Sequence, residues 1–397
     1  MIKKVLISGA SIAGPAAAYW LARRGIDVTV VERTASLRGG GYPIDIRGAA
    51  CEVVKRMGLY PRLQQAHVDT RALEFVDGQG ERIARIAPEE ITGGEQGSDI
   101  EIARGDLAAA LYEATRDSVN YRFDDSIAAL DERDDGVEVG FAKGGTAKYD
   151  VVIGADGLHS NVRSLVFGPE HQFEHYLGFC FAGFSMKNTF GLSHEGTNYN
   201  VLGKWAGIYA PGETNSVFGL LVFRYPESPF RTPISDAGKR ALTARMFEGE
   251  NWLVPQMVEA MLGADDLFFD AVSQIRMPSW SSGGVVLTGD AAHATSFLSG
   301  QGSSVALVSA YVLAGELTSG ASYREAFAAY ERVARGFIEG NQNLVSEGRT
   351  TMMPKTQEEL DFRNAMLRGA HGAASEVTEQ RRADRARIYN AIDLPNY

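Results

Sequence analysis

Cysteine is scarce in this sequence. Only Cys51 and Cys180 occur among 397 residues, and two cysteines so far apart cannot build a disulfide framework or a cysteine-ligated zinc site. We therefore expect a reduced, cytoplasmic protein without a metal site.

Positive charge is in deficit as well. The chain has 39 Lys and Arg against 50 Asp and Glu, which gives a formal net charge of −11. A negative balance disfavours nucleic acid and anionic membrane surfaces as partners. An anion can be held only where a few basic side chains gather locally.

Long hydrophobic runs that could cross a membrane are also missing. The stretch from Ala291 to Gly315 has no formally charged residue and is long enough to span a bilayer, but glycine, glutamine and serine at 300–304 make its centre polar. Glycine and serine at 9–14 interrupt the apolar start of the chain, which argues against a signal peptide. We expect no integral membrane segment.

Glycine, in contrast, is abundant. The chain has 44 glycines, about 11% against a usual ~7%, while its 45% hydrophobic and 22% charged residues are ordinary for a globular protein. Glycine allows sharp turns and close approach of the backbone to a ligand. The length fits one large or two ordinary domains.

Strands and helices alternate from the start of the chain. An apolar strand at Lys4–Ser8, a loop, a helix at Pro15–Arg24 and a second apolar strand at Val28–Val31 form a βαβ unit. From about His175 to Tyr225, aromatic and β-branched runs separated by glycine and proline favour an antiparallel sheet. Helical patterns return after about residue 300.

These patterns predict an α/β fold with an insertion, because no Pro/Ser-rich linker divides the chain. We expect a Rossmann-like nucleotide-binding domain, an inserted antiparallel β-sheet domain for the substrate, and C-terminal helices. The expected boundaries are 1–72, 98–172 and 276–320 for the first, 73–97 and 173–275 for the second, and 321–397 for the helical region.

The first motif is Gly9-Ala10-Ser11-Ile12-Ala13-Gly14. In a dinucleotide-binding turn the first glycine makes the tight turn, the second position approaches the pyrophosphate, and the third packs helix on strand. Ser11 replaces the second glycine, and its hydroxyl can donate to a phosphate. Glu32 ends the second strand, where an acceptor for a ribose hydroxyl belongs. This context favours a dinucleotide site over a plain strand–turn–helix.

Two further strand-to-helix turns carry a carboxylate. Asp156-Gly157 follows the apolar strand at 151–153, and Gly289-Asp290 follows the strand at 285–287 and precedes Gly300-Gln301-Gly302. Each alone is an ordinary turn with a capping acid. Together with the first motif, and in this order, they predict helix N-termini and carboxylates around one ligand.

These motifs, with Arg104 in Ala103-Arg104-Gly105-Asp106, make the sequence resemble the class A flavoprotein monooxygenases, the single-component FAD-dependent aromatic hydroxylases. The resemblance covers nearly the whole chain. The stretch Gly-Gly-Tyr-Pro-Ile-Asp-Ile-Arg-Gly at 40–48 and the ending Ile392–Tyr397 are most similar to the branch with tetracycline-inactivating and polyketide-tailoring monooxygenases.

The resemblance implies FAD as the bound cofactor. Glu32 would face the adenosine ribose, Arg33 the adenine end, and Arg104 the ribose and pyrophosphate. Arg47 would lie on the flavin side next to the substrate and is the catalytic candidate. The implied cofactor-binding set is Gly9, Ser11, Ile12, Ala13, Gly14, Glu32, Arg33, Arg47, Arg104, Asp156, Asp290, Gly300 and Gly302.

The substrate implied by the resemblance is a small apolar molecule, aromatic or polycyclic, activated as a phenol or enol. The expected substrate-lining residues are Phe184, Trp205, Phe218 and Phe297, although side chains that alternate along strands cannot all face one ligand. No residue identifies itself as a substrate-deprotonating base. We interpret His293 as structural or flavin-facing, and we expect a monomer or homodimer.

The implied activity uses NADPH or NADH as a transient reductant and O₂. A flavin C4a-hydroperoxide would pass its distal oxygen to the substrate and hydroxylate it. Phe297 and Ser304 stand where the family usually has proline and asparagine, so two alternatives stay open. One is an FAD-dependent oxidase or dehydrogenase without oxygen insertion, and the other is a ligand-sequestering flavoprotein.

Overall fold

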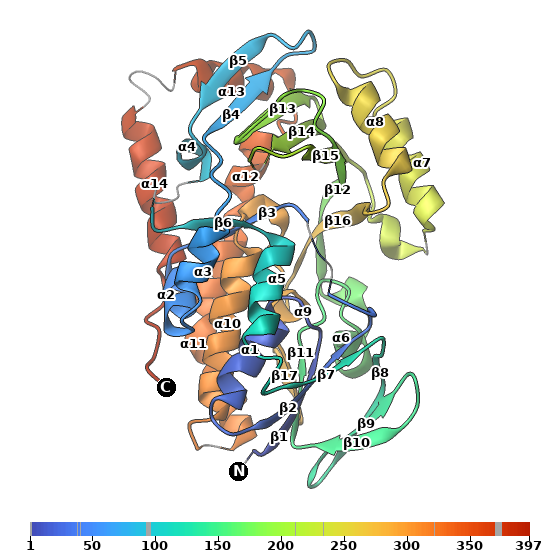
Figure 1. Ribbon diagram of the computed structural model, residues 1–397, viewed down its shortest axis with the longest axis vertical. Coiled ribbons are helices and arrows are strands. Elements are labelled where there is room, and N and C mark those ends of the chain that lie inside the picture. Colours follow the sequence, from blue (N-terminus) through green and yellow to red (C-terminus); the bar gives the residue numbers. More distant parts are fainter. Residues whose placement is uncertain are drawn as a thin grey trace.

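The computed structural model describes most of the chain, namely residues 2–37, 39, 41–92, 97–210, 212–232, 234–320, 322–369 and 375–397. Gly40, the first residue of the stretch at 40–48, lies outside the described residues. Two sheets lie toward opposite ends of the long axis of the molecule, with helices α10 and α11 running beside the lower one (Figure 1).

A six-stranded sheet has the order β17-β18-β11-β1-β2-β7. All neighbours pair in parallel except β17 with β18. Val5, Leu6 and Ile7 have no exposed surface, because a parallel sheet is buried on both faces and so needs continuous apolar strands. Its strands are β1 (Lys4–Ser8), β2 (Asp27–Glu32), β7 (Asn120–Phe123), β11 (Val151–Gly154), β17 (Ser281–Ser282) and β18 (Val285–Leu287).

Helices and small sheets surround this layer. Helix α1 packs on β1 and β2 and against α10. The helices are α1 (Ala13–Ala22), α2 (Ala49–Arg56), α3 (Tyr60–Gln65), α5 (Arg104–Glu113), α6 (Asn161–Val166), α9 (Asp290–His293) and α10 (Gly302–Leu317). One small sheet pairs β3 (Pro43–Ile46) with β6 (Ile100–Ala103). In the other, β9 (Gly136–Phe141) lies between β8 (Ile127–Arg133) and β10 (Thr146–Tyr149).

The second sheet has seven strands in the order β16-β12-β15-β14-β13-β4-β5. All pairs are antiparallel except β4 with β13. Its strands are β4 (Ala72–Val76), β5 (Arg82–Ile86), β12 (Glu174–Lys187), β13 (Glu195–Val201), β14 (Lys204–Ala210), β15 (Ser216–Arg224) and β16 (Phe268–Ile275).

The two faces of this second sheet pack against different partners. Alternate side chains of a strand point to opposite faces. Phe184 and Phe223 pack with residues of α7 (Asp236–Met246) and α8 (Val254–Gly263) on the outer face. Phe181 and Trp205 pack on the inner face with Leu298, which comes from the loop before α10.

The remaining helices link the two layers. The 3₁₀ turns at Glu170–Gln172, Pro229–Arg231 and Phe297–Ser299 and helix α4 (Pro88–Thr92) are short. A capping box of Ser322 and Glu325 begins α11. The C-terminal helices are α11 (Tyr323–Asn343), α12 (Val345–Met352), α13 (Gln357–Gly369) and α14 (Ser375–Tyr389).

The predicted α/β class, with a Rossmann-like layer, a second sheet and C-terminal helices, is confirmed. The antiparallel pairing expected within 175–225 is confirmed, and β4 adds one parallel pair to the same sheet. Turn residues within 175–225 predict pairing only between strands that are neighbours in sequence. β4 comes from far upstream, so its pairing could not be predicted from them. The predicted domain boundaries stay a prediction.

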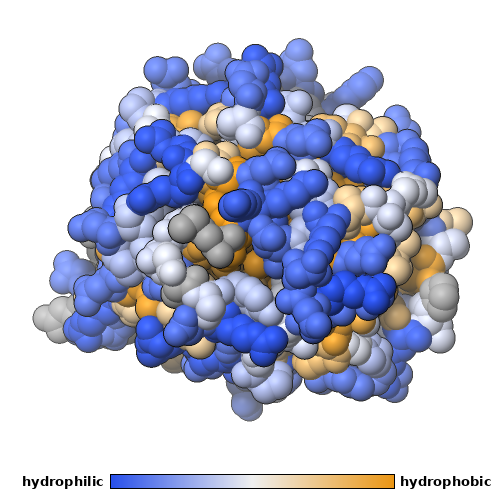
Figure 2. Space-filling view, turned by 90° about the horizontal axis from the view of Figure 1, so that it is seen from below, coloured by the Kyte–Doolittle hydropathy of each residue, from blue (hydrophilic) through white to orange (hydrophobic). Residues whose placement is uncertain are grey.

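No helix in the described ranges has both the length and the apolar character needed to cross a membrane. Seen from below, the surface is largely hydrophilic, and hydrophobic residues show only in small areas between polar ones (Figure 2).

Candidate cofactor and substrate site

The turn from β1 into the start of α1 requires glycine at two positions. Gly9 has φ +106°, and a Cβ there would lie 2.4 Å from the Ala155 carbonyl oxygen. A Cβ at Gly14 would lie 1.9 Å from the Gly9 carbonyl oxygen. No side chain fits at such distances. The loop therefore folds tightly over β11 and leads directly into α1, whose first turn buries Ile12 and Ala13.

Two charged side chains flank this loop. Arg104, the first residue of α5, donates from Nη2 to Ser11 Oγ at 2.8 Å. Glu32 accepts the Ala10 N–H at 2.9 Å through Oε2 and both the N–H and hydroxyl of Thr34 through Oε1. Oε2 accepts only one hydrogen bond, so it keeps a lone pair that a ribose hydroxyl could use.

The predicted residues of the first motif are thus brought together, and they fit a dinucleotide. The glycine turn, the N-terminus of α1 and the Arg104 guanidinium can bind a pyrophosphate. Glu32 lies beside them, where it can accept a ribose hydroxyl. Arg33 follows Glu32 and has an exposed side chain.

Asp156 is engaged within the protein. Its carboxylate accepts Ser160 Oγ at 2.5 Å and the Val162 N–H at 3.1 Å, and Ser8 Oγ lies 3.4 Å from it. Burial raises the pKa of Asp156, and these hydrogen bonds oppose the shift. The residue therefore ties β1 and β11 to the start of α6.

Arg163 then fastens α6 to α9. Its side chain is fully buried and donates to the Ala291 carbonyl at 2.9 Å and to Glu170 at 2.6 Å. The turn at Asp156-Gly157 and the turn at Gly289-Asp290 are therefore held together.

Asp290 begins α9 next to the nucleotide loop. A Cβ at Gly289 would lie 2.8 Å from Ala13 Cβ, so the starts of α9 and α1 touch. Asp290 is exposed, although the surrounding protein still desolvates its carboxylate enough to raise its pKa, while Arg104 lowers it. Burial raises the pKa of the nearby Tyr42; the charge on Arg104 lowers this pKa, and the charge on Asp290 raises it.

Helix α10 begins beside β3. Gly300 adopts the left-handed conformation, φ +66°, and a Cβ at this position would lie 3.9 Å from Asp45 Oδ2. Ser304 accepts the Arg47 N–H at 3.1 Å and donates to the Asp45 carbonyl at 3.2 Å. Arg47, buried, pairs with Asp45 at 2.7 Å.

Three of the four predicted substrate-lining residues share one surface. Phe297 lies with its ring centroid 4.9 Å from that of Phe181 and 6.3 Å from that of Trp205. Phe218 packs against Tyr42 at 6.0 Å. We call Phe181, Trp205, Phe218 and Phe297, which occupy this inner surface, the aromatic cluster.

Phe184 does not belong to it, and this prediction needs correction. The residue is fully buried on the outer face of the sheet, among side chains from α7 and α8. Phe181 and Phe184 are three positions apart on β12, so the alternation of a strand sends them to opposite faces.

Several polar residues of this region gave no sequence signal. Asn198 Oδ1 accepts Trp205 Nε1 at 2.9 Å and the Tyr209 hydroxyl at 2.8 Å, which fixes both rings. Asp45 and Glu101 are cross-strand partners on β3 and β6. Burial and then Asp45 raise the pKa of Glu101 to about 7, against the opposing effects of a hydrogen bond from Thr70 and of the charge on Arg47. Only the pairing of two distant strands brings these acids together.

His293 is fully enclosed. Its Nε2 lies 3.2 Å from the Tyr330 hydroxyl, and burial lowers its pKa to about 3. A neutral imidazole that packs against the Trp280 ring and contacts the Tyr330 hydroxyl fits the structural interpretation.

Known proteins share this architecture. The model of a family described as "FAD binding domain" matches residues 3–188. An uncharacterized protein of Mycobacterium tuberculosis is 44% identical over 362 residues, covering 91% of this chain and 97% of the relative. A flavin-dependent monooxygenase from an unknown prokaryotic organism is 36% identical over 398 residues, covering 100% of this chain and 99% of the relative.

The chain belongs to the flavin-dependent monooxygenases. The predicted class A, FAD-binding family is confirmed, and the protein is an oxidoreductase. The crystal structure of the tetracycline destructase Tet(55) has a TM-score of 0.84 and 33% identity, and the match covers 100% of this chain and 99% of that structure.

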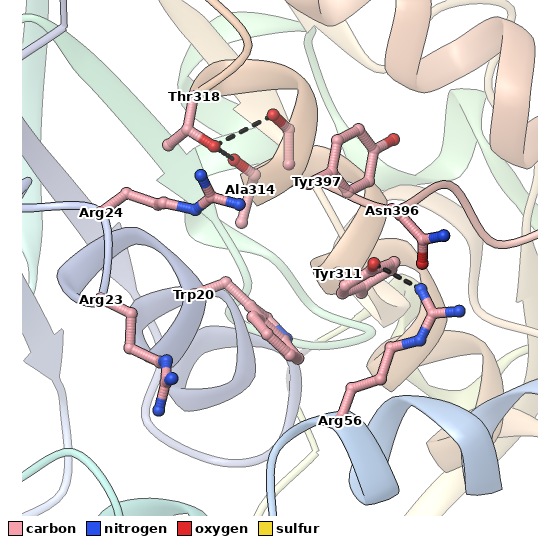
Figure 3. Close-up of a pocket in the computed structure, with 10 residues that line it drawn as sticks. Trp20, Arg23, Arg24, Arg56, Tyr311, Ala314, Thr318, Asn396 and Tyr397 are labelled. Atoms are coloured by element: carbon pink, nitrogen blue, oxygen red, sulfur yellow. Dashed lines mark hydrogen bonds between the residues drawn. The ribbon is translucent and has the colours of Figure 1, made fainter.

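A separate cavity of about 510 Å³ lies at the other ends of α1 and α10 in this monooxygenase (Figure 3). Arg56 donates there to the Tyr311 hydroxyl at 2.6 Å and to the Pro395 carbonyl at 2.9 Å. The Tyr397 ring lies where a side chain at Gly315 would be. These contacts hold the C-terminal segment on α10, so we assign the cavity a structural role.

Proposed function

We propose that this flavin-dependent monooxygenase uses NADPH or NADH and O₂ to hydroxylate an aromatic, polyketide or tetracycline-like substrate that carries an acidic phenol or enol. The observation that supports this most is the aromatic cluster, which joins Phe297, just before Gly300, to the inner face of the second sheet. Small-molecule sites are mostly apolar surfaces with few polar groups.

The residues of the first motif would hold the cofactor. Ser11, Arg104 and the N-terminus of α1 would bind the pyrophosphate, and Glu32 the ribose, with Arg33 toward the adenine. Asp290, Gly300 and Gly302 would lie along the flavin half. Asp156 would act by holding this framework. Bound FAD would accept electrons from NAD(P)H and react with O₂, which is chemistry that no protein side chain can supply.

The chain itself would orient the substrate and exclude water. Trp205, Phe218 and Phe297 would cover an apolar ring system, and dry surroundings limit wasteful loss of activated oxygen. Arg47, fixed by Asp45, would place positive charge beside the reacting ring. We propose Glu101, the cross-strand partner of Asp45, as the group that accepts the proton of a phenol or enol near neutral pH, since a base is most effective when its pKa is near the working pH.

The experiment is a turnover assay with purified holoenzyme. NADPH or NADH, ¹⁸O₂ and either tetracycline or a set of phenols are supplied, and products are analysed by mass spectrometry. We expect substrate-stimulated NAD(P)H oxidation and one ¹⁸O atom in the product. Tetracycline is a first probe because Tet(55), 33% identical, is a tetracycline destructase.

Other outcomes identify the alternatives. An oxidised product without ¹⁸O would indicate an oxidase or dehydrogenase. Flavin reduction that is slow and unchanged by any added compound would indicate a ligand-sequestering flavoprotein. Both cysteines are free and buried, which supports the proposed cytoplasmic location.

A further inference from the structure

Three arginines are buried among the described residues: Arg47, Arg163 and Arg363. Arg47 pairs with Asp45 at 2.7 Å and Arg163 with Glu170 at 2.6 Å. Burial of a charge is costly unless a partner compensates it. These two arginines obey that rule.

Arg363 does not. No ion pair in the described part of the chain includes it. Its Nε has no acceptor there, as is also true of Arg163, but Arg163 has the carboxylate of Glu170 and Arg363 has none. Desolvation lowers its pKa to about 10, and no neighbouring charge contributes. The chain has 50 acidic residues, yet none of those that the structure describes lies beside this guanidinium.

The side chain is nevertheless held in a defined place. It lies on the buried side of α13 between Leu360 and Leu367 and is 7% exposed. Its Nη1 donates to Asn200 Oδ1 at 3.1 Å, and its guanidinium carbon is 5.0 Å from the centroid of the Phe75 ring. An aromatic face and one amide therefore fix the guanidinium while offering no negative charge.

This position adjoins the aromatic cluster. Asn200 is two residues from Asn198 on β13, so both side chains lie on the inner face of the sheet, and Asn198 binds the Trp205 indole. Asn200 Nδ2 also donates to the Met352 carbonyl at 2.7 Å. Met352 packs in the same hydrophobic group as Trp205 and Phe297.

We infer that Arg363 and Asn200 form an anion subsite that takes a carboxylate or enolate of the aromatic substrate. A planar guanidinium with free donors matches two oxygens side by side. The inference rests on the proposed function, because it places the anion on the molecule covered by the aromatic cluster. It narrows the substrate class to acidic aromatic compounds.

The test compares two naphthols that differ by one charge. Holoenzyme is titrated with 6-hydroxy-2-naphthoate and with 2-naphthol, and binding is followed by the flavin absorbance change. The wild type should bind the carboxylate about tenfold or more tightly, as expected for charge-assisted hydrogen bonds. Arg363→Met should lose this preference, and Arg363→Lys should keep part of it. Arg368→Met is the control, since Arg368 is an exposed arginine on the same helix.

Thermal unfolding supplies a second measurement. An arginine with a purely structural role would lower the Tm when replaced. An uncompensated buried cation should instead leave the Tm of ligand-free Arg363→Met unchanged or higher. The carboxylate probe should raise the Tm of the wild type but not that of this variant.

Three results would overturn the inference: equal affinity of the wild type for both probes, no binding of the carboxylate up to about 1 mM, or an unchanged preference in Arg363→Met. Failure of the proposed function is distinguishable. If the preference depends on Arg363 but no compound is hydroxylated, the anion subsite stands and the monooxygenase substrate proposal fails.

Discussion

At the residue scale, Arg104 connects most of the proposed cofactor site. It contacts Ser11 directly and shifts the pKa of both Asp290 and Tyr42. In a chain with net charge −11, such a fixed cation is what an anionic cofactor requires.

Arg104→Ala should therefore lose FAD. Removing charge-assisted hydrogen bonds weakens binding by roughly ten- to a hundredfold, which is measured as flavin content after gel filtration and as Kd by FAD titration. Asp290→Ala should lose FAD as well. Arg47→Ala should retain more FAD but oxidise NAD(P)H without forming product.

Arg116→Ala is the matched control, because Arg116 is exposed just beyond α5 and pairs with nearby acids. Equal FAD content in all four variants would contradict this division of roles.

Sequence motifs predicted site residues that lie at local turns, such as Ser11 and Asp290. They could not identify Asn198 or Arg363, because an isolated polar residue in a strand or helix has no motif. The misplacement of Phe184 has a different origin. Aromatic composition indicates a buried side chain, but the face it occupies depends on strand register.

At the element scale, the start of α1 depends on how closely it approaches the β1 loop. Gly14 packs so near the Gly9 carbonyl that a methyl group would lie 1.9 Å from its oxygen. The helix and the loop would have to separate to admit even alanine.

Gly14→Ala should consequently lower both the Tm and the FAD content of the protein. Gly336→Ala is the control, since a Cβ at Gly336 in α11 meets nothing within 4 Å. That change should raise stability by about 0.5–1 kcal/mol, because alanine is the better helix former. Denaturant unfolding of both variants measures the contrast, and similar stability for the two would refute the packing argument.

Several elements could be predicted from the sequence because their apolar pattern is local. The strands at the start of the chain and α10 are examples. The parallel pairing of β4 with β13 and the partnership of Asp45 with Glu101 could not, because each joins segments distant along the chain and no local pattern encodes that pairing.

At the scale of the whole molecule, His159 links the two sheets. It stands between β11 and α6, and its Nε2 lies 3.0 Å from Asp270 on β16 while its Nδ1 lies 2.8 Å from Glu170. Burial alone would lower its pKa, but the hydrogen bonds to Asp270 and Glu170 outweigh burial and raise the pKa to about 10.

This arrangement predicts a loss of stability in alkaline solution. A raised histidine pKa stabilises the folded state fully below its ordinary value of about 6.5, and the stabilisation disappears as the pH rises from there through about 10. The Tm of the wild type should fall across this range more than that of His159→Gln. Parallel Tm curves for the two proteins would exclude the link.

The order of strands in the parallel sheet also affects how the protein is made. β1 pairs with β11, and β11 pairs with β18, which ends at Leu287. At ~5–20 residues per second, a ribosome needs on the order of tens of seconds after finishing β1 to produce that last strand. Throughout this time the apolar strands of the nascent chain have no complete sheet to join. Chaperone dependence and aggregation on overexpression should therefore reflect the strand order more than the stability of the finished fold.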